Sequence, residues 1–262
     1  GAPLEWKLAD TQTSYAIGLA LDAFSDGNIP FMEKNLAETV RRKNADDTGA
    51  MRPEYSLMTG FIGTSWVSQA LTEHGATDLA YKQLQNEQYP SWLYAIDQGA
   101  TSIWERLNGY TTENGFGGNN SMNSFNHYSF GAVGRWMMAY SLGIKRDDAS
   151  PGFKHFILRP EPDTTGQMKW ARGHYASMYG RIDSSWKVEG GTLNYQATVP
   201  ANTTATLYLP ASTANGITEG GKPAAGSNGV RFIKFENGKA VYELSSGEYK
   251  FSSSLNSESR GN

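Results

Sequence analysis

The spacing of apolar residues changes near residue 150 of this 262-residue chain. Before that point apolar residues recur every three or four positions, as on one face of an amphipathic helix. The first such stretch follows Thr11 or Thr13, either of which can cap a helix. Asp26-Gly27-Asn28 ends it, and Pro30 favours the first turn of a second helix that runs to about Arg42. The apolar positions of these two helices are Ala16, Leu19, Ala20, Ala23 and Phe24, then Leu36 and Val40.

Residues 64–84 have the pattern of two helices joined by a short turn. Val67, Ala70 and Leu71 recur at helical spacing, and Gly75 ends that helix before a second one starts at Thr77 or Asp78. This predicts an αα-hairpin. A last helix is predicted from about Asn126 to Leu142.

Beyond residue 150 the period changes from helical to alternating. Apolar residues occupy every second position of 193–199 and 205–209, and Asn237-Gly238 is a strong hairpin turn between two further apolar runs. Residues 153–158, 175–182 and 249–251 are predicted as additional short strands. Many closely spaced strands with no intervening helix predict an antiparallel β-sandwich.

These patterns give a multidomain protein of helices followed by strands. Its expected parts are a helical domain over 1–145, an antiparallel β-sandwich over 146–253 and a disordered tail over 254–262. Five or so helices are too few to close a double ring of helices. The remaining helices must therefore come from elsewhere, or the ring is open.

Composition excludes several functions. The net charge of -3 and the absence of a long basic run disfavour nucleic acid as a partner. There is no cysteine, which excludes disulfides and thiolate metal sites, and no apolar run approaches the ~20 residues of a membrane span. The histidines lack metal-ligand spacing, so no metal or cofactor is expected. Abundant glycine and aromatic residues suit a concave carbohydrate site, although large β-domains share that composition.

The segment from Tyr89 to Gly134 carries the candidate chemistry. Glu105 lies between Trp104 and Arg106, so a carboxylate, a ring and a cation occur within three residues. Inverting glycoside hydrolysis uses one carboxyl to protonate the leaving oxygen and another to activate water. Spacing alone also allows an exposed Glu–Arg pair of little energetic value, and it favours this second interpretation over a catalytic role.

Other polar and aromatic residues of this segment allow two interpretations each. His127 can contact a sugar hydroxyl or cap the helix that starts near Asn126. Trp92 can form a wall of a sugar site or pack against a helix. Asp97 can be a second carboxylate or a helix cap, and the cap is favoured.

Three motifs of this chain resemble the bacterial α-L-rhamnosidases of glycoside hydrolase family 78. They are Gly60-Phe61-Ile62-Gly63-Thr64, then Tyr89-Pro90-Ser91-Trp92 with Gln98 to Arg106, and Met122 to Tyr128 running into Gly131 to Gly134. Weaker similarity continues through Pro200 to Ala205.

The resemblance implies the C-terminal part of an (α/α)6 barrel followed by a β-sandwich, and a parent enzyme that removes terminal α-L-rhamnose from glycans or glycosides with inversion. It implies that Glu105 is the general base. Residues expected to bind the substrate are His127, Trp92, Trp104, Arg106 and Asn126.

Two departures from the family pattern matter. Leu107 stands where many relatives have a further tryptophan. The family's general acid lies in an acidic loop of the first half of the barrel, and no such segment precedes Leu4. We therefore expect this chain to need the missing N-terminal part of the barrel as a partner and to have little or no activity alone. A non-catalytic sugar-binding module and a purely structural piece remain as alternatives.

Overall fold

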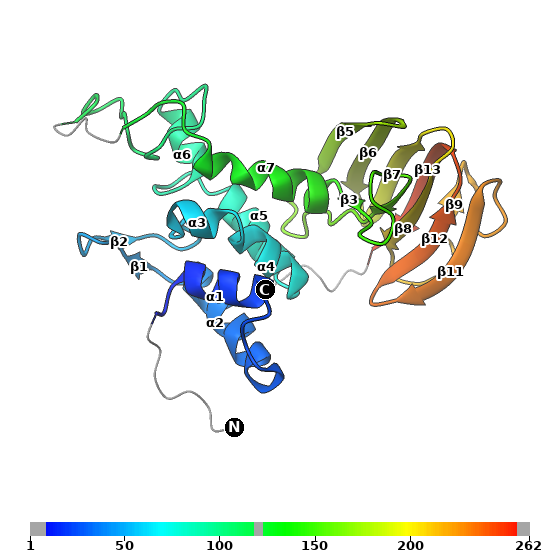
Figure 1. The fold of residues 1–262 in the computed structure, drawn as a ribbon, viewed down its shortest axis with the longest axis horizontal. Helices are drawn as coiled ribbons and strands as arrows, with labels where there is room; N and C mark the ends of the chain where they lie inside the picture. The colour runs from blue at the N-terminus through cyan, green and yellow to red at the C-terminus, as the bar shows by residue number, and fades with distance from the viewer. Residues whose placement is uncertain (1–8, 118–122, 256–262) are drawn as a thin grey trace. The chain divides into compact units, whose positions relative to one another are not determined.

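The computed structural model describes residues 9–117 and 123–255 and divides into two compact units (Figure 1). The helical unit is Gly1–Arg135 and the β unit is Trp136–Asn262. The domain limits expected from the sequence, 1–145 and 146–253, stay a prediction. The predicted tail, 254–262, overlaps the last strand at Ser254, and its residues from 256 lie outside the described part.

Short helices and one small hairpin make up the helical unit. They are α1 (Gln12–Ala20), η1 (Asp26–Asn28), α2 (Ile29–Arg41), β1 (Asn44–Ala45), β2 (Met51–Arg52), α3 (Gly60–Thr64), α4 (Val67–Glu73), α5 (Thr77–Leu84), α6 (Trp92–Asp97) and η2 (Ser129–Ala132). The predicted αα-hairpin is confirmed as α4 and α5, with Gly75 in the left-handed region between them.

The first helix begins as predicted but ends early. The Thr11 hydroxyl caps α1 by accepting a hydrogen bond from the Ser14 amide. The prediction that the helix continues through Phe24 is wrong, because α1 ends at Ala20 and the chain turns back. The Phe24 ring then lies over Gly18, where a Cβ atom would be 2.2 Å from the ring. The Phe24 side chain therefore packs on the surface of α1, and its segment does not extend the helix.

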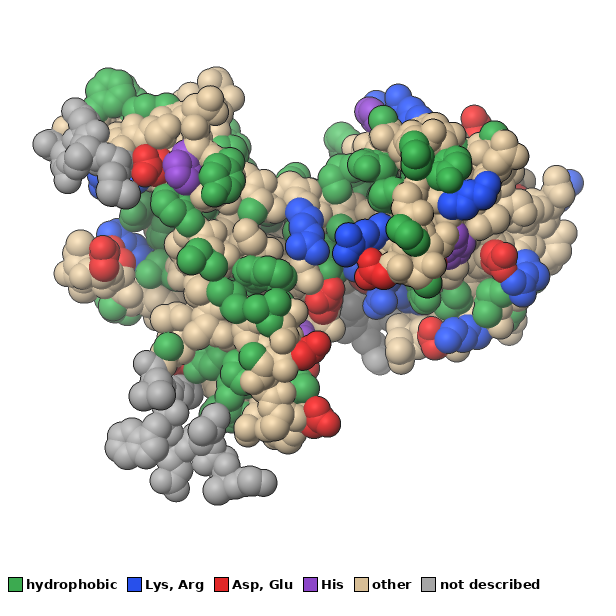
Figure 2. Space-filling view, viewed as in Figure 1, with side chains coloured by type: hydrophobic (Ala, Val, Ile, Leu, Met, Phe, Trp, Pro, Cys, Tyr) green, Lys and Arg blue, Asp and Glu red, His purple; other side chains and the backbone are tan. Residues whose placement is uncertain are grey.

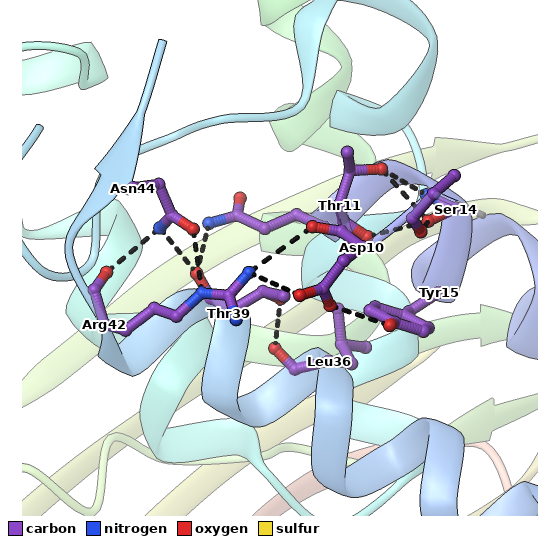
Figure 3. A network of polar contacts seen from close by, with 10 residues as sticks. Asp10, Thr11, Ser14, Tyr15, Leu36, Thr39, Arg42 and Asn44 are labelled. Carbon is purple, nitrogen blue, oxygen red and sulfur yellow. Dashed lines mark hydrogen bonds and ion pairs between the residues drawn. The ribbon is translucent and has the colours of Figure 1, made fainter. Parts of the chain in front are cut away.

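Polar contacts join the start of α1 to the end of α2 (Figure 3). Asp10 accepts a hydrogen bond from the Tyr15 hydroxyl at 2.7 Å and pairs with the Arg42 guanidinium at 3.0 Å. Asn44 donates to the carbonyl oxygens of Thr39 and Arg42 at the end of this helix, where backbone carbonyls have no partner within the helix. The cationic Arg42 at this helix end is thus held by an acidic residue.

Large apolar side chains reach the surface of the helical unit, and hydrophobic groups are visible on the face shown in Figure 2. The side chain of Ile62 is 72% exposed and that of Tyr128 is 87% exposed. Other exposed members of this set are Leu21, Met51, Phe61, Ile96, Ile103 and Phe116. So many exposed apolar groups on one compact unit are typical of a surface that packs against further protein.

The predicted helix 126–142 is wrong in its start and in its regularity. The helical stretch begins at Ser129 as the 3₁₀-helix η2, continues as α7 (Val133–Trp136) and ends as the π-helix η3 (Met137–Ser141). Asn126 and His127 precede it because the His127 amide donates to the carbonyl of Ile103 at 2.8 Å. Pairing with a distant segment therefore replaces the first helical turn.

Two sheets form the β unit. One has the strand order β10-β9-β13-β7-β6-β5, and the other has the order β11-β12-β8-β4-β3. Their bounds are β3 (Ile144–Arg146), β4 (His155–Leu158), β5 (Trp170–Ser177), β6 (Gly180–Glu189), β7 (Thr192–Val199), β8 (Thr204–Pro210), β9 (Thr218–Glu219), β10 (Lys222–Pro223), β11 (Val230–Glu236), β12 (Lys239–Leu244) and β13 (Gly247–Ser254).

The predicted sandwich is confirmed, with one parallel pair, β4 with β8, in otherwise antiparallel sheets. Asn237-Gly238 forms the predicted turn, with positive φ at both residues. The single strand predicted over 175–182 is wrong. That segment is the end of β5, a turn at Met178-Tyr179 and the start of β6, and the Ser177 hydroxyl donates to the Gly180 carbonyl across the turn.

Candidate active site

Two segments far apart in the sequence run side by side in the helical unit and carry the candidate residues. The Ile103 carbonyl accepts the His127 amide at 2.8 Å, and the Glu105 amide donates to the Ser124 carbonyl at 2.8 Å. The Ser102 hydroxyl also donates to the carbonyl of Phe125. We call residues 102–106 the base segment and residues 123–127 the histidine segment. Backbone pairing fixes their register, so Glu105 and His127 belong to one local structure.

One oxygen of the Glu105 carboxylate is fixed by the histidine segment. The Ser124 amide donates to Oε2 at 2.8 Å, while the Ser124 carbonyl accepts from the Glu105 amide. The side chain is half-buried. Within the described residues, no hydrogen bond is found at its second oxygen, Oε1, which can accept a proton. The carboxylate is thus positioned by one oxygen and able to react through the other.

Two aromatic rings lie against the His127 imidazole. The Phe61 ring stacks on it at 4.7 Å between centroids, and the Tyr128 ring lies parallel to it at 5.5 Å. The Ser129 amide donates to Nδ1 at 3.4 Å, so the neutral ring carries its proton on Nε2. This contact at the start of η2 matches the capping role, and it leaves an N–H donor for another group.

The two candidate tryptophans lie inside the helical unit, and each is 7% exposed. Trp92 follows Ser91, whose hydroxyl caps α6, and the Trp92 Nε1 donates to the Phe130 carbonyl at 2.8 Å. Trp104 packs edge-on against Phe125, 5.0 Å between centroids. These rings support the segments that carry the polar groups, and little of either ring is accessible to a ligand.

The remaining polar candidates lie at the surface. Arg106 and Asn126 are both exposed on the two paired segments. Asp97 is also exposed and is the last residue of α6. The interpretation of Asp97 as a helix cap is therefore wrong, because Ser91 supplies the cap of that helix.

Sequence reasoning overlooked two residues of this arrangement. Phe61 and Ser124 both lie in the motifs that carry the resemblance, but neither has reactive chemistry that marks it as a site residue. Their roles depend on contacts across 66 and 19 positions of sequence, from Phe61 to His127 and from Ser124 to Glu105. Met122, the first residue of the third motif, lies outside the described residues, as do residues 118–121 before it.

Neither a metal site nor a membrane-spanning helix is found in the described part of the chain. The described part of the chain contains no group of three or more His, Asp or Glu side chains that could hold a metal ion. Among the helices of that same part, none has both the length and the apolar character needed to cross a membrane.

Two family models together match most of the chain. The model described as the bacterial alpha-L-rhamnosidase 6 hairpin glycosidase domain matches residues 7–140, and that described as the bacterial alpha-L-rhamnosidase C-terminal domain matches 143–224. An α-L-rhamnosidase from Formosa agariphila is 37% identical over 241 residues, which is 92% of this chain and 24% of that relative.

Solved structures give the same picture. The structure of Streptomyces avermitilis α-L-rhamnosidase complexed with L-rhamnose matches with a TM-score of 0.78 and 33% identity, over 93% of this chain and 21% of that one. An α-L-rhamnosidase from Dictyoglumus thermophilum matches with a TM-score of 0.75 and 26% identity, over 93% and 25% of the two chains. The chain therefore spans about a quarter or less of the length of these relatives, and it matches their C-terminal part.

Proposed function

The chain belongs to the bacterial α-L-rhamnosidase family, and from this we propose that it is the C-terminal part of an inverting α-L-rhamnosidase with Glu105 as general base. The observation that carries the proposal is the geometry of the Glu105 carboxylate. One oxygen is held by the Ser124 amide, and the other is able to take a proton from water. The expected substrates are glycans or glycosides that end in α-L-rhamnose.

The reaction follows from this geometry. Glu105 removes a proton from a water molecule as the water attacks the anomeric carbon, and the bond to the leaving oxygen breaks on the opposite face. A second carboxyl must protonate that oxygen, at roughly 6.5–9.5 Å from the base in inverting enzymes. We assign this acid to the N-terminal part of the barrel in the longer protein. Exposed side chains such as Ile62 then pack against the helices of that part.

Substrate binding uses the groups around the base. His127 stacks with Phe61 and Tyr128 and accepts the Ser129 amide at Nδ1, so its neutral ring donates a hydrogen bond from Nε2 to a sugar hydroxyl. Exposed Arg106 and Asn126 contact the sugar at the rim of the site. Trp92 and Trp104 are almost fully buried and support this geometry through Phe130 and Phe125.

Hydrolysis of p-nitrophenyl α-L-rhamnoside by the longer protein tests the base. Glu105→Gln keeps the size of the side chain and should lower kcat by about 10²–10⁴-fold, the usual contribution of a general base. The matched control is Glu113→Gln, because Glu113 is an exposed carboxylate on the same long loop. Unchanged turnover in Glu105→Gln would remove Glu105 from the mechanism.

Two further measurements separate the parts of the proposal. Proton NMR of the first-formed product should show β-L-rhamnose before mutarotation, and an α-product would contradict inversion. The 262-residue chain alone should show little or no turnover because it lacks the general acid. Turnover by this chain that disappears in Glu105→Gln would show that both carboxyls are present in it.

A further inference from the structure

The six-stranded sheet of the β unit has an outer face with no role in the proposed reaction. Side chains alternate strictly along its strands. Ile182, Ser184 and Trp186 of β6 are buried. Lys187 of the same strand, which lies between β5 and β7 in the sheet, is exposed. The outer face forms a groove of about 880 Å³ across β5, β6, β7 and β13. This volume lies within the roughly 300–1,000 Å³ typical of small-ligand sites.

One large ring stands on this otherwise polar face. Trp170 lies on the edge strand β5, and its side chain is 63% exposed. In this position on an edge strand, the ring is accessible to a ligand. The C–H face of a pyranose ring packs well on such a surface, because the indole provides a flat apolar area with little entropy to lose.

Positive charge dominates the groove. Arg172, Lys187 and Lys250 line it, together with one acidic side chain, Glu189. Glu189 pairs with Lys187 at 2.6 Å. In the described part of the chain, no ion pair is found for Arg172 or Lys250. The Glu219 carboxylate also lies beside Lys250, because its Oε1 accepts the Lys250 amide at 3.3 Å. The groove therefore holds three cations, of which Lys187 is paired and Lys250 has an acidic neighbour.

Strand register places these groups in one row. Arg172 is paired with Ser185, Ser185 with Gln196, and Gln196 with Lys250. Three strand spacings separate Arg172 from Lys250, or about 14 Å. The neighbouring row holds Trp170 at its edge and the amide of Asn194 further in. The distance between the cations exceeds one sugar ring, and the amides between them suit hydroxyl groups.

We propose that this groove binds an anionic oligosaccharide that carries carboxylate groups, as in a chain of uronic acids. Trp170 stacks on one sugar ring, Arg172 binds its carboxylate through two N–H groups, and Lys250 pairs with a carboxylate further along the chain. Asn194 and Gln196 bind the hydroxyl groups between them. The site is separate from Glu105 and would hold a charged glycan by the β unit.

Calorimetric titration of the 262-residue chain with trigalacturonate tests the proposal, and the methyl ester of the same trisaccharide is the matched neutral ligand. We expect the acid to bind at least about tenfold more tightly than the ester, because each ion-supported hydrogen bond contributes about that factor or more. Raising the salt from about 50 mM to about 200 mM should weaken binding of the acid and leave the ester nearly unaffected.

Variants locate the binding. Trp170→Ala and Arg172→Gln should each weaken binding of trigalacturonate at least about tenfold. Both side chains are exposed, so the fold should be retained, which circular dichroism checks. Lys234→Gln is the control. Lys234 is an exposed lysine on β11 of the other sheet, and its loss should leave the affinity unchanged.

Four results obtained with this chain alone would overturn the proposal. They are no binding of trigalacturonate at millimolar concentration, equal affinity for acid and ester, unchanged affinity in both groove variants, and tighter binding of a single-stranded oligonucleotide. Binding by this chain that is lost in the longer protein would also overturn it, because another domain would then cover the face. None of these results depends on Glu105.

Discussion

A buried glutamine joins three helices of the helical unit and allows a sharp stability prediction. Gln12 of α1 is 1% exposed. Its Nε2 donates to the carbonyls of Thr39 and Ser56, while its Oε1 accepts from the Met58 amide and from Gln83 Nε2. The network links α1, α2 and α5 to the segment that precedes α3. Because α3 carries Phe61, the same network supports the stacking on His127.

Gln12→Met removes these hydrogen bonds with little change in volume. Three of the four partners keep another bond. The Thr39 carbonyl keeps Asn44, and the Ser56 carbonyl and Gln83 Nε2 keep each other. In the described structure the Met58 amide has no second acceptor. Its loss should cost about 1–3 kcal/mol, and each of the other bonds about 0.5–1.5 kcal/mol, part of which the burial of methionine offsets. The expected loss is about 2–4 kcal/mol.

Urea unfolding of the 262-residue chain, followed by circular dichroism at the helical band, measures this loss. The helical unit dominates that signal, since the β unit consists mainly of strands. The midpoint should fall by about 1–2 M for a typical urea dependence. Gln88→Met, at an exposed glutamine that follows α5, is the control and should change stability by less than about 0.5 kcal/mol. Equal midpoints for the two variants would show that the network adds nothing to stability.

Three further predictions follow from single contacts. Gly143→Ala places a Cβ atom 2.1 Å from the Arg159 carbonyl carbon at a φ of 78° and should cost more than about 3 kcal/mol in thermal unfolding. Gly166→Ala has the same φ with open space and should cost only about 1 kcal/mol; equal losses would contradict the clash. Hydrogen bonds from the Thr48 hydroxyl, from Arg52 and from two amides lower the pKa of Asp46 to about 2. Ionised Asp46 should therefore stabilise the fold at any pH above its ordinary pKa and lose that effect as the pH falls through about 2. The difference in Tm between the original chain and Asp46→Asn should vanish near pH 2, and a difference that stays constant with pH would exclude this linkage. In the longer protein, Phe61→Leu removes the stack on His127 and should weaken rhamnose binding by about 2–12-fold, while unchanged affinity would show that the stack does not position His127.

Local patterns in the sequence predict the elements that local interactions form. The Thr11 cap, the Gly75 turn and the Asn237-Gly238 turn each depend on residues within a few positions of one another, and the structure has all three. Alternation in β7 and β8 likewise predicts which of their side chains are buried. These signals suffice for the order of elements and for the change from helices to sheets.

Predictions fail where a distant contact overrides the local pattern. The helix expected from Asn126 starts at Ser129 because the Ile103 carbonyl takes the His127 amide. The helical spacing of apolar residues places Phe24 in the first helix and does not predict that its ring packs over Gly18. The strand expected over 175–182 fails for a local reason, because the turn at Met178-Tyr179 has a weak sequence signal and apolar residues on both sides.

Positions in the sequence identify the reactive groups of the candidate site but not what holds them. Spacing alone favoured an exposed Glu–Arg pair, whereas in the structure the Glu105 carboxylate accepts the Ser124 amide. No local rule predicts that pairing, because the partner lies 19 residues away across a long loop. The same holds for Phe61, which becomes part of the site only because α3 brings it against the histidine segment.

The pairing of the two segments has a consequence for catalysis. The Ser124 amide binds the Glu105 carboxylate, and three residues later the His127 amide is bound by the Ile103 carbonyl. A shift of the histidine segment would therefore move the proposed base and the His127 imidazole together. Their spacing would be kept, but their position relative to the general acid proposed for another part of the barrel would change. Rates that depend on the distance between two carboxyls are sensitive to such a shift. The packing of Trp104 on Phe125 and the bond from Trp92 to Phe130 oppose such a shift, so under the proposed mechanism these buried tryptophans would support the reaction by positioning the two segments.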